Sequence, residues 1–424
     1  MSEPLDCVIV GAGLAGLACA GELVRRGRRV TVLEAADRVG GRVVTDTVEG
    51  FRIDRGFQVY NDAYPEGRRQ LDLGGLALGR FEPGALIATD GRLLRVSDPW
   101  RRPLAAVGSL FSGAVGLGDA LRTARLRHDA VRGVRSGAVD PEAATRGSER
   151  TTREELAARG FSEAFVRRFF VPFFGGVFLE RSLDTAAEVF LFDFAMFSLG
   201  RACLPAGGME AIGRQLAARL PEGSVRLGTR VEGVESTRVM LAGGSVLAAR
   251  DVVVATDGPA AGGILPEGLR GNLVGRLWKK TRLVAFAAKR SPLASRTLVV
   301  TAGEAGPIDN LTVPSDVAAG YAPPGWSLVT VSVRGGLDSG DVVAAVKRQA
   351  TGWFGGLVDG WRHLATVDVP RALPDESPAA RRGRPIEPRL ASGLWICGDH
   401  CGAASINAAL ASGRRCAEAV LAAG

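Results

Sequence analysis

The chain has 424 residues, of which 46% are hydrophobic and 23% charged, and its formal net charge is +8. This length is enough for a large core and two domains, and the composition excludes a disordered or fibrous chain. The basic residues, nearly all arginine, are not interleaved with aromatic residues as in proteins that stack bases, so we expect no nucleic-acid partner.

The six cysteines and three histidines favour neither disulfides nor a metal site. There is no Cys-x-x-Cys pair, and Cys7 and Cys397 lie in apolar runs typical of buried strands, so we expect reduced thiols and a cytoplasmic protein. Glu3 and Asp6 stand close before the first apolar run, which leaves no room for a signal peptide. No apolar run is long enough to cross a bilayer.

The first predicted unit is a strand, a glycine-rich turn and a helix. An apolar run at 7–10 predicts a buried strand, and the spacing of small and apolar residues predicts a helix over 17–26. In a dinucleotide site the three glycines of such a turn permit the tight bend, the approach of a pyrophosphate and close helix packing. The predicted phosphate-binding residues are Gly11, Ala12, Gly13, Leu14, Ala15 and Gly16.

A second buried strand at 30–33 leads to an acid and a second glycine turn. Glu34 is placed to accept both hydroxyls of an adenosine ribose, and its charge disfavours a 2′-phosphate. The second turn permits close backbone approach and offers guanidinium groups to phosphate, although a solvated loop is the alternative. Its candidate residues are Arg38, Gly40, Gly41 and Arg42.

The next candidate contact is a break in a strand. Residues 51–59 begin as a strand and break at Gly56, which favours close approach of a planar ligand, so Gly56, Phe57 and Gln58 are predicted to contact it. Residues 101–135 are helical in composition and rich in arginine. We expect a solvated helical face there, and peripheral contact of a basic amphipathic surface with lipid is the open alternative.

Most of the chain's 17 phenylalanines fall within residues 161–197. Such a concentration predicts core packing, the wall of a chamber for a hydrophobic or flat substrate, or both. The run at 204–209 then returns to the character of a nucleotide-binding domain. Residues 225–231 are predicted to form one strand that brings Val231 near an adenine, and another buried strand follows at 246–255.

The C-terminal half predicts several strands and a second half-site. Alternating strands are expected over 278–334, a helix over 340–358 and a connector rich in proline and arginine over 370–388. A strand at 394–397 then meets an acid that can bind a ribityl hydroxyl, and the following helix can stabilise negative charge on a flavin ring with its N-terminus. The candidate residues are Gly398, Asp399, Ser405, Ile406 and Asn407.

These motifs together resemble the flavin amine oxidase superfamily, which includes protoporphyrinogen oxidases and phytoene-type carotenoid desaturases. The resemblance spans the whole chain and implies bound FAD and hydride transfer to flavin N5, with the ring between two domains. The implied fold class is α/β, with a Rossmann-like FAD-binding domain that is discontinuous in sequence and a second, α+β substrate-binding domain. The expected FAD-binding domain comprises residues 1–79, 205–270 and 385–424, and the substrate-binding domain comprises 80–204 and 271–384.

Within the superfamily the resemblance favours one branch. Amine oxidases of this type resemble one another in a pair of aromatic residues that face the flavin and in a lysine near flavin N5. One aromatic position falls on Ser405, and Trp395 is either the other aromatic residue or a core residue. The lysine position falls close to Thr281; Lys280 stands one residue away, and a one-residue shift in a strand turns a side chain to the other face. The motif at 205–209 and the phenylalanine-rich stretch are more similar to the desaturase and porphyrinogen oxidase branch.

The sequence therefore predicts an FAD-dependent oxidoreductase that dehydrogenates a small apolar organic substrate, and oxidation of a C–C bond is the favoured interpretation. The alternatives are amine or amino-acid oxidation, and isomerisation or non-redox binding of FAD. No catalytic side chain is assigned. Cys397, His400 and Cys401 leave covalent attachment of FAD open.

Overall fold

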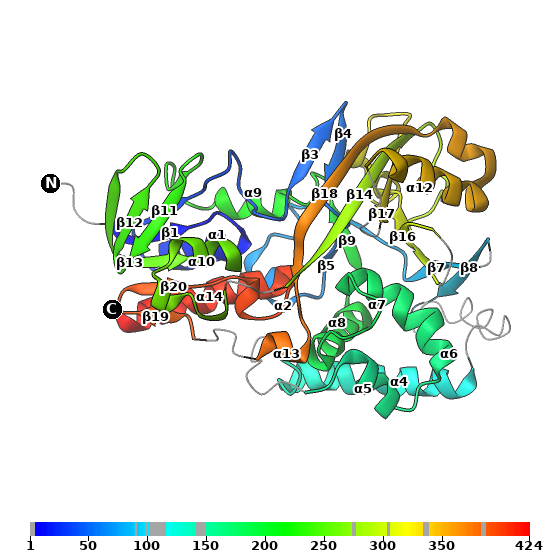
Figure 1. Ribbon diagram of the computed structural model, residues 1–424, viewed down its shortest axis with the longest axis horizontal. Helices are drawn as coiled ribbons and strands as arrows, with labels where there is room; N and C mark the ends of the chain where they lie inside the picture. Colours follow the sequence, from blue (N-terminus) through cyan, green and yellow to red (C-terminus); the bar gives the residue numbers. More distant parts are fainter. Residues whose placement is uncertain are drawn as a thin grey trace.

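The fold is α/β, with two main sheets and a group of helices (Figure 1). The first sheet and both ends of the chain lie on one side of the molecule, and the second sheet and the helical group lie on the other. The computed structural model describes residues 5–89, 91–97, 101, 116–140, 149–273, 277–302, 306–333, 339–382 and 387–424.

The first sheet is built around buried parallel strands. Every residue of β2 (Val30–Leu33) is buried, as expected for a parallel strand covered on both faces. The parallel strands run in the order β10 (Val225–Arg226), β2, β1 (Leu5–Val10), β13 (Val246–Val254) and β20 (Leu394–Ile396), and antiparallel β12 (Arg238–Leu241), β11 (Val231–Glu235) and β19 (Arg389–Ala391) complete the sheet.

The register of this sheet places the carboxyl ends of its central strands level with one another. Val10 pairs with Leu33 on one side and with Val254 on the other, and Val254 pairs with Ile396. The residues that follow these strands therefore emerge at one edge of the sheet.

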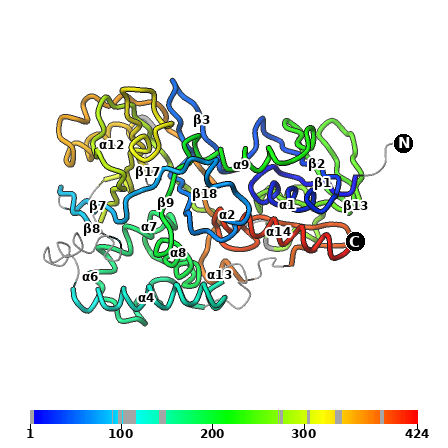
Figure 2. Tube along the Cα trace, turned by 180° about the vertical axis from the view of Figure 1, so that it is seen from behind, coloured from blue at the N-terminus to red at the C-terminus, as the bar shows by residue number. Residues whose placement is uncertain are grey.

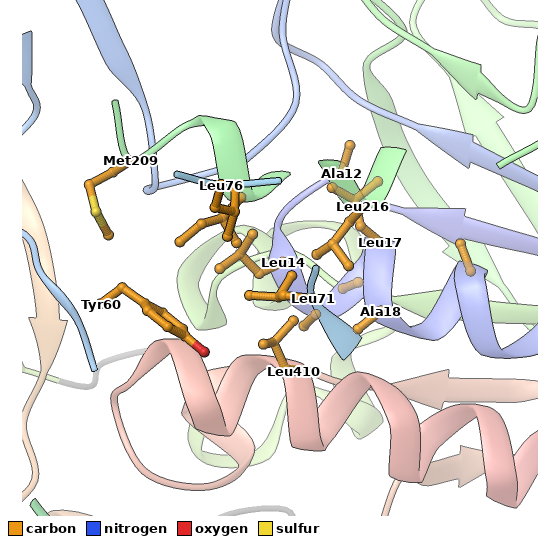
Figure 3. Packing of buried hydrophobic residues seen from close by; sticks show 14 of the residues in the cluster. Ala12, Leu14, Leu17, Ala18, Tyr60, Leu71, Leu76, Met209, Leu216 and Leu410 are labelled. Atoms are coloured by element: carbon orange, nitrogen blue, oxygen red, sulfur yellow. The ribbon is translucent and has the colours of Figure 1, made fainter. Parts of the chain in front are cut away.

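Two helices from opposite ends of the sequence pack together on this sheet. Helix α1 (Leu14–Arg25) lies against α14 (Ile406–Ala423), and Leu14 and Leu17 belong to the same buried cluster as Leu410 (Figure 3). An added Cβ at Gly413 would lie 2.1 Å from the carbonyl oxygen of Ala15, so the two backbones are almost in contact. Helix α9 (Ala211–Ala217) packs on α1, and α10 (Gly258–Ile264) packs on β11 of this sheet.

The second sheet has seven strands, and α12 (Ser339–Phe354) packs on one of its faces. Long strands β14 and β18 reach from this sheet toward the start of α14 (Figure 1). The strand order is β18 (Arg362–Pro374), β14 (Trp278–Ala288), β17 (Ser327–Val333), β16 (Ile308–Thr312), β15 (Val299–Thr301), β7 (Gly84–Thr89) and β8 (Arg92–Ser97).

Short strands and helices connect the two sheets. Strands β3 (Thr45–Val48) and β4 (Phe51–Asp54) form a ribbon, and β5 (Tyr60–Asn61), β9 (Ala202–Pro205) and β6 (Leu78–Arg80) form a small sheet. The short helices are α2 (Pro65–Gln70), α11 (Pro314–Val317) and α13 (Pro378–Arg381). The helical group contains α4 (Leu117–Ser136), α5 (Thr152–Ala158), α6 (Glu163–Phe165), α7 (Val171–Phe178) and α8 (Ala187–Leu199).

The phenylalanines of the helical group form a core. Phe170, Phe174 and Phe190 are almost fully buried, and their rings contact one another with centroids 4.9–6.3 Å apart. Core packing is thus confirmed for these rings. A chamber wall stays a prediction for the half-buried phenylalanines, such as Phe169 and Phe173.

Two local predictions were wrong. Residues 225–231 were expected to form one strand, but the chain leaves β10 after Arg226 and turns at Gly228, whose φ of +64° breaks the strand before β11. Residues 370–388 were expected to form a connector, but strand β18 extends to Pro374 because it pairs with β14, and α13 follows. Of the arginine-rich segment at 101–135, residues 102–115 lie outside the described residues.

The strands of the first sheet come from residues 1–79, 205–270 and 385–424, and those of the second from 80–204 and 271–384. On this basis we propose the same division into two domains. Among the described residues, no helix combines the length and the apolar character that crossing a bilayer requires. No group of three or more potential metal ligands occurs there either.

The close packing of α1 on α14 predicts unequal effects of two glycine substitutions. Gly413→Ala places its Cβ against the carbonyl oxygen of Ala15, so we expect the free energy of unfolding to fall by about 1–3 kcal/mol. The matched control is Gly21→Ala in α1, where no atom lies within 4 Å of the added Cβ, and it should stabilise the protein or leave it unchanged. Urea unfolding measures both, and equal effects would contradict the packing account.

Candidate functional site

The candidate site lies at the edge where the parallel strands of the first sheet end. The first glycine turn follows β1, Glu34 follows β2, and Gly398 and Asp399 follow β20. The level register of these strands brings the N-terminal and C-terminal motifs to the same edge. In open α/β sheets, ligands bind outside the carboxyl ends of the strands.

The glycines of the first turn have different local roles. Gly11 has a φ of +109°, and an added Cβ at Gly16 would lie 2.1 Å from the Gly11 carbonyl oxygen, so both serve the turn itself. Gly13 has an ordinary φ of −70°, and the nearest atom to an added Cβ is the Cα of Gly41 at 4.0 Å. The space over Gly13 is open beside the N-terminus of α1, where backbone N–H groups can bind an anion.

The second glycine turn lies directly against the first. Gly13 and Gly40 form a parallel bridge, and the Gly40 N–H donates to the carbonyl oxygen of Ala12 over 2.9 Å. Gly41 has a φ of +63°, and an added Cβ there would lie 3.1 Å from the Cα of Gly13. The two turns thus form one cradle of bare backbone, and we propose that the cofactor's pyrophosphate binds over it.

Glu34 closes one end of this cradle. Its carboxylate accepts hydrogen bonds from the Ala12 N–H at 2.8 Å and from the Ala36 N–H at 2.9 Å. The Thr229 N–H donates to the Glu34 carbonyl oxygen over 2.8 Å, which holds the segment before Val231 beside the end of β2. We propose that this end of the cradle receives the adenosine, with Glu34 at the ribose and Val231 near the adenine.

An ion pair closes the other end of the cradle. A guanidinium nitrogen of Arg42 lies 2.5 Å from the buried carboxylate of Asp399, and Arg42 also donates to the carbonyl oxygen of Ala372 over 3.1 Å. Arg38, by contrast, is turned toward Asp46, 3.0 Å away. From their places in the sequence, Arg42 and Asp399 were expected to contact different parts of the cofactor. Because they pair, we propose that they act together beside its phosphate and ribityl groups.

The start of α14 is held in a fixed orientation. The Ser405 Oγ caps the helix by accepting from the Ala408 N–H at 3.0 Å, and the Asn407 Oδ1 accepts from the Glu66 N–H at 3.0 Å. The Gly398 N–H donates to the Ser412 Oγ over 3.0 Å and ties the strand end to the helix. Residues 405–407 thus lie at a helix N-terminus whose first turn carries no acidic residue, which suits a group that gains negative charge.

A small cavity adjoins the residues predicted to contact a planar ligand. Gly56, Phe57 and Gln58 line it together with side chains of the second sheet. Its apolar lining includes Leu204, Leu283 and Leu328, and the remaining lining residues are Arg52, Asp54, Thr312, Pro314, Tyr321 and Thr330. The cavity therefore lies between the cofactor-binding part of the chain and the second sheet.

Every polar side chain in the lining of this cavity has a protein partner. The Tyr321 hydroxyl donates to Asp54 over 2.6 Å, and the hydroxyls of Thr312 and Thr330 lie 2.9 Å apart. Gln58 donates to the carbonyl oxygens of Arg42 and Arg55, both at 2.9 Å, and Arg52 donates to the Ala206 carbonyl oxygen over 3.2 Å. Burial raises the pKa of Asp54 to about 6, although its hydrogen bonds oppose the rise.

The strand residue beside Gly56 is threonine. An added Cβ on Gly56 would lie 3.5 Å from the Thr281 methyl group. Lys279 forms an ion pair with Glu180, and Lys280 is exposed where the pairing of β14 with β18 is irregular. Neither lysine lines the cavity at Gly56.

Sequence reasoning missed Asp193, a carboxylate on the phenylalanine-rich helix α8. Burial and the charge of Glu376 raise its pKa to about 7. The neighbouring Phe192 stacks on Tyr64, whose hydroxyl has its pKa raised by burial and by Asp193. In the sequence, Asp193 stands out as a single acid within the apolar run at 189–197. Residues with strongly shifted pKa values are enriched at functional sites.

The donor set of this edge fits FAD. It provides bare backbone for a pyrophosphate, a carboxylate for a ribose, a second carboxylate on the chain's other terminus and a helix N-terminus for the flavin ring. The buried ring of His400 lies against Gly398. A Cβ added to Gly398 would be 2.5 Å from the His400 Nδ1. This order of groups along the edge matches the order of adenosine, pyrophosphate, ribityl chain and isoalloxazine in the cofactor.

The chain matches one protein family over most of its length and several curated proteins over short segments. The family model of flavin-containing amine oxidoreductases matches residues 14–421. An L-amino-acid oxidase of Bungarus fasciatus is 44% identical over 82 residues, which cover 19% of this chain and 16% of that protein. A coproporphyrinogen III oxidase of Propionibacterium freudenreichii subsp. freudenreichii is 38% identical over 77 residues, covering 18% of this chain and 15% of that protein.

Structural comparison extends the similarity to the whole chain. The structure of putrescine oxidase bound to putrescine superimposes with a TM-score of 0.73 at 18% sequence identity, covering 99% of both chains. At this identity the match shows the shared fold. The matched segments of the two curated relatives are less than a fifth of their lengths, so their substrates do not transfer directly to this chain.

The open space over Gly13 predicts a variant that separates cofactor binding from folding. Gly13→Ala should leave the apoprotein's free energy of unfolding within about 0.5 kcal/mol of the parent, because its backbone is ordinary and its Cβ meets no close atom. We expect its affinity for FAD to fall at least about tenfold, since the Cβ stands where the pyrophosphate approaches. Reconstitution of the apoprotein with FAD, followed by flavin fluorescence, measures this affinity.

The control for Gly13→Ala is Gly16→Ala, which should destabilise the apoprotein itself because its Cβ would clash with the Gly11 carbonyl oxygen. Normal FAD affinity in Gly13→Ala would contradict the assignment of the phosphate site.

Proposed function

The chain belongs to the family of flavin-containing amine oxidoreductases and is an FAD-dependent oxidoreductase, and from this premise we propose that it dehydrogenates a small apolar organic substrate at a C–C bond. Bound FAD supplies a hydride acceptor at flavin N5. The chain's own residues hold the cofactor at the sheet edge, and we place the reacting part of the substrate beside Gly56, at a cavity of about 20 Å³ that must widen to admit it.

The observation that carries this proposal is the pairing of the polar groups around the cavity. Because Asp54, Gln58, Thr312, Thr330 and Tyr321 already have hydrogen-bond partners within the protein, the surface left for a ligand is mainly aliphatic. A charged ammonium placed there would lose its hydration and would have to compete with Tyr321 for the Asp54 carboxylate, which is unfavourable. An apolar substrate has no such cost and gains from burial.

Thr281 and Ser405 support the same proposal. The resemblance to amine oxidases places a lysine close to Thr281 and an aromatic residue at Ser405. Thr281 presents a methyl group to Gly56, and Ser405 is occupied as the cap of α14. At these two positions the chain therefore lacks the lysine and the aromatic residue that the resemblance to amine oxidases leads us to expect.

Amine or amino-acid oxidation is the second candidate function. It is favoured by the identity of the relatives, since L-amino-acid oxidase and putrescine oxidase are both similar to this chain. The coproporphyrinogen III oxidase among the relatives is equally consistent with the first candidate. The two candidates differ in the bond that is oxidised, and an assay of the flavin can distinguish them.

We expect partly saturated polyenes or porphyrinogens, mixed with the FAD-loaded enzyme without oxygen, to remove the oxidised-flavin absorbance. Primary amines and L-amino acids should leave it unchanged over the same time. Stopped-flow spectroscopy with product analysis checks this result. Rapid loss of the absorbance with an amine alone would contradict the proposal, and so would product formation from the apolar substrates without net loss, since that result indicates isomerisation.

A cavity variant tests the location of the substrate once one is found. Leu283→Asn places an amide in the aliphatic lining, and an unpaired buried polar group costs about 1–3 kcal/mol, so kcat/KM should fall roughly 5- to 150-fold with FAD content unchanged. The control is Val284→Thr. Val284 lies on the opposite face of β14 and packs in a different core cluster. If it lowers kcat/KM as much as Leu283→Asn does, the cavity is not the substrate site.

A further inference from the structure

Helix α4 presents a face of exposed leucines and arginines that the cofactor site does not explain. Leu126 and Ala130 on its inner face are fully buried against the phenylalanine core, so the orientation of the helix about its axis is fixed. At the N-terminal end of the outer face, Leu117 and Leu121 are 75% and 74% exposed. Figure 2 shows α4 along the lower border of the molecule, outside α8.

The C-terminal part of the same face is basic. Arg125, His128, Arg132 and Arg135 are exposed and recur at the spacing of one helical face that continues from the two leucines. Part of this face lines a groove of about 700 Å³. Its lining residues are Ala124, Arg127, His128, Val131, Arg132, Arg135, Ser136 and Leu199.

The acidic residues of α4 are directed elsewhere. Asp119 is buried and accepts hydrogen bonds from the backbone N–H and the hydroxyl of Ser162, at 3.0 and 2.6 Å. Asp129 pairs with Arg159 at 2.9 Å. Among the described residues of α4, the outer face thus carries positive charge that no acid of the same helix neutralises.

We propose that this face of α4, from Leu117 to Arg135, docks the protein on the surface of an anionic phospholipid membrane. The leucines enter the boundary between headgroups and acyl chains, and the arginines pair with lipid phosphates, as in helices that lie in the plane of a membrane. The order of the residues favours lipid over other polyanions. A nucleic acid would be met by aromatic side chains between the cations, and the face has none.

A membrane at this face would lie against the helical group and away from the first sheet, where the cofactor is bound (Figure 1). The proposal goes beyond the proposed function and does not depend on it, because vesicle binding requires neither substrate nor turnover. It predicts that binding depends on anionic lipid and weakens as salt screens the arginines.

The test is co-sedimentation of the FAD-loaded, full-length protein with phosphatidylcholine vesicles that contain or lack phosphatidylglycerol. We expect binding to the anionic vesicles and little to the others. Each basic residue near an anionic surface contributes about fivefold to the partition coefficient, so Arg132→Glu with Arg135→Glu should lower it more than about tenfold. Leu117→Gln with Leu121→Gln should also weaken binding, because the apolar insertion is lost.

Matched controls carry the same changes at exposed residues elsewhere. The double variant Arg290→Glu with Arg348→Glu changes the net charge as much as the α4 arginine variant does. Leu357→Gln makes the same substitution, at one exposed leucine outside α4. Both should bind vesicles nearly as the parent does. Circular dichroism and FAD content show that every variant is folded.

Several outcomes would overturn the proposal. These are equal binding to both kinds of vesicle, unchanged binding of the α4 arginine variant, and equal losses in the charge control. Retention on single-stranded nucleic acid without vesicle binding would also overturn it and would assign the face to a different polyanion.

Discussion

The level register of the parallel strands in the first sheet is the constraint on which the site depends. Pairing of Val10 with Leu33 and Val254, and of Val254 with Ile396, brings the segments after these strands to one edge. The pairing itself results from short, mainly apolar runs that can be buried on both faces. The contact of α1 with α14 then fixes the helix N-termini at that edge, and Arg42 bonds to Asp399 across 357 positions of sequence. A slip of one residue in this sheet would separate the halves of the cofactor site.

The sequence predicted the parts of this arrangement that local chemistry determines. The first strand–turn–helix unit and the helix capped by Ser405 were both confirmed, because glycine spacing, apolar runs and caps act over a few residues. The strand predicted over 225–231 was wrong because backbone N–H groups of Gly228 and Thr229 bond to the distant Ala36 and Glu34. The pairing of Arg42 with Asp399 and the approach of Thr281 to Gly56 could not be predicted, since only tertiary structure joins residues so far apart.

The two halves of the molecule contribute different properties to the proposed function. The first sheet supplies bare backbone and fixed charges, which suit a phosphate-bearing cofactor. The second sheet supplies a cavity in which polar side chains satisfy one another and leave aliphatic surface, as between Thr312 and Thr330. In the helical group, α4 exposes a face of leucines and arginines to solvent. If an apolar substrate resides in a membrane, docking through α4 would bring the enzyme to it, so the two proposals are compatible although each is tested separately.

The central claim is that the two ends of the chain bind opposite halves of one FAD molecule. Equilibrium titration of the apoprotein and its Asp399→Asn variant with FAD and with ADP tests it most directly. Loss of a charge-assisted hydrogen bond should weaken FAD binding by about 1.5–3 kcal/mol, roughly 10- to 150-fold. ADP, which lacks the ribityl chain and the flavin ring, should compete with FAD and should lose much less affinity than FAD does in the variant. Unchanged FAD affinity in the variant, or an equal loss for ADP, would contradict the claim.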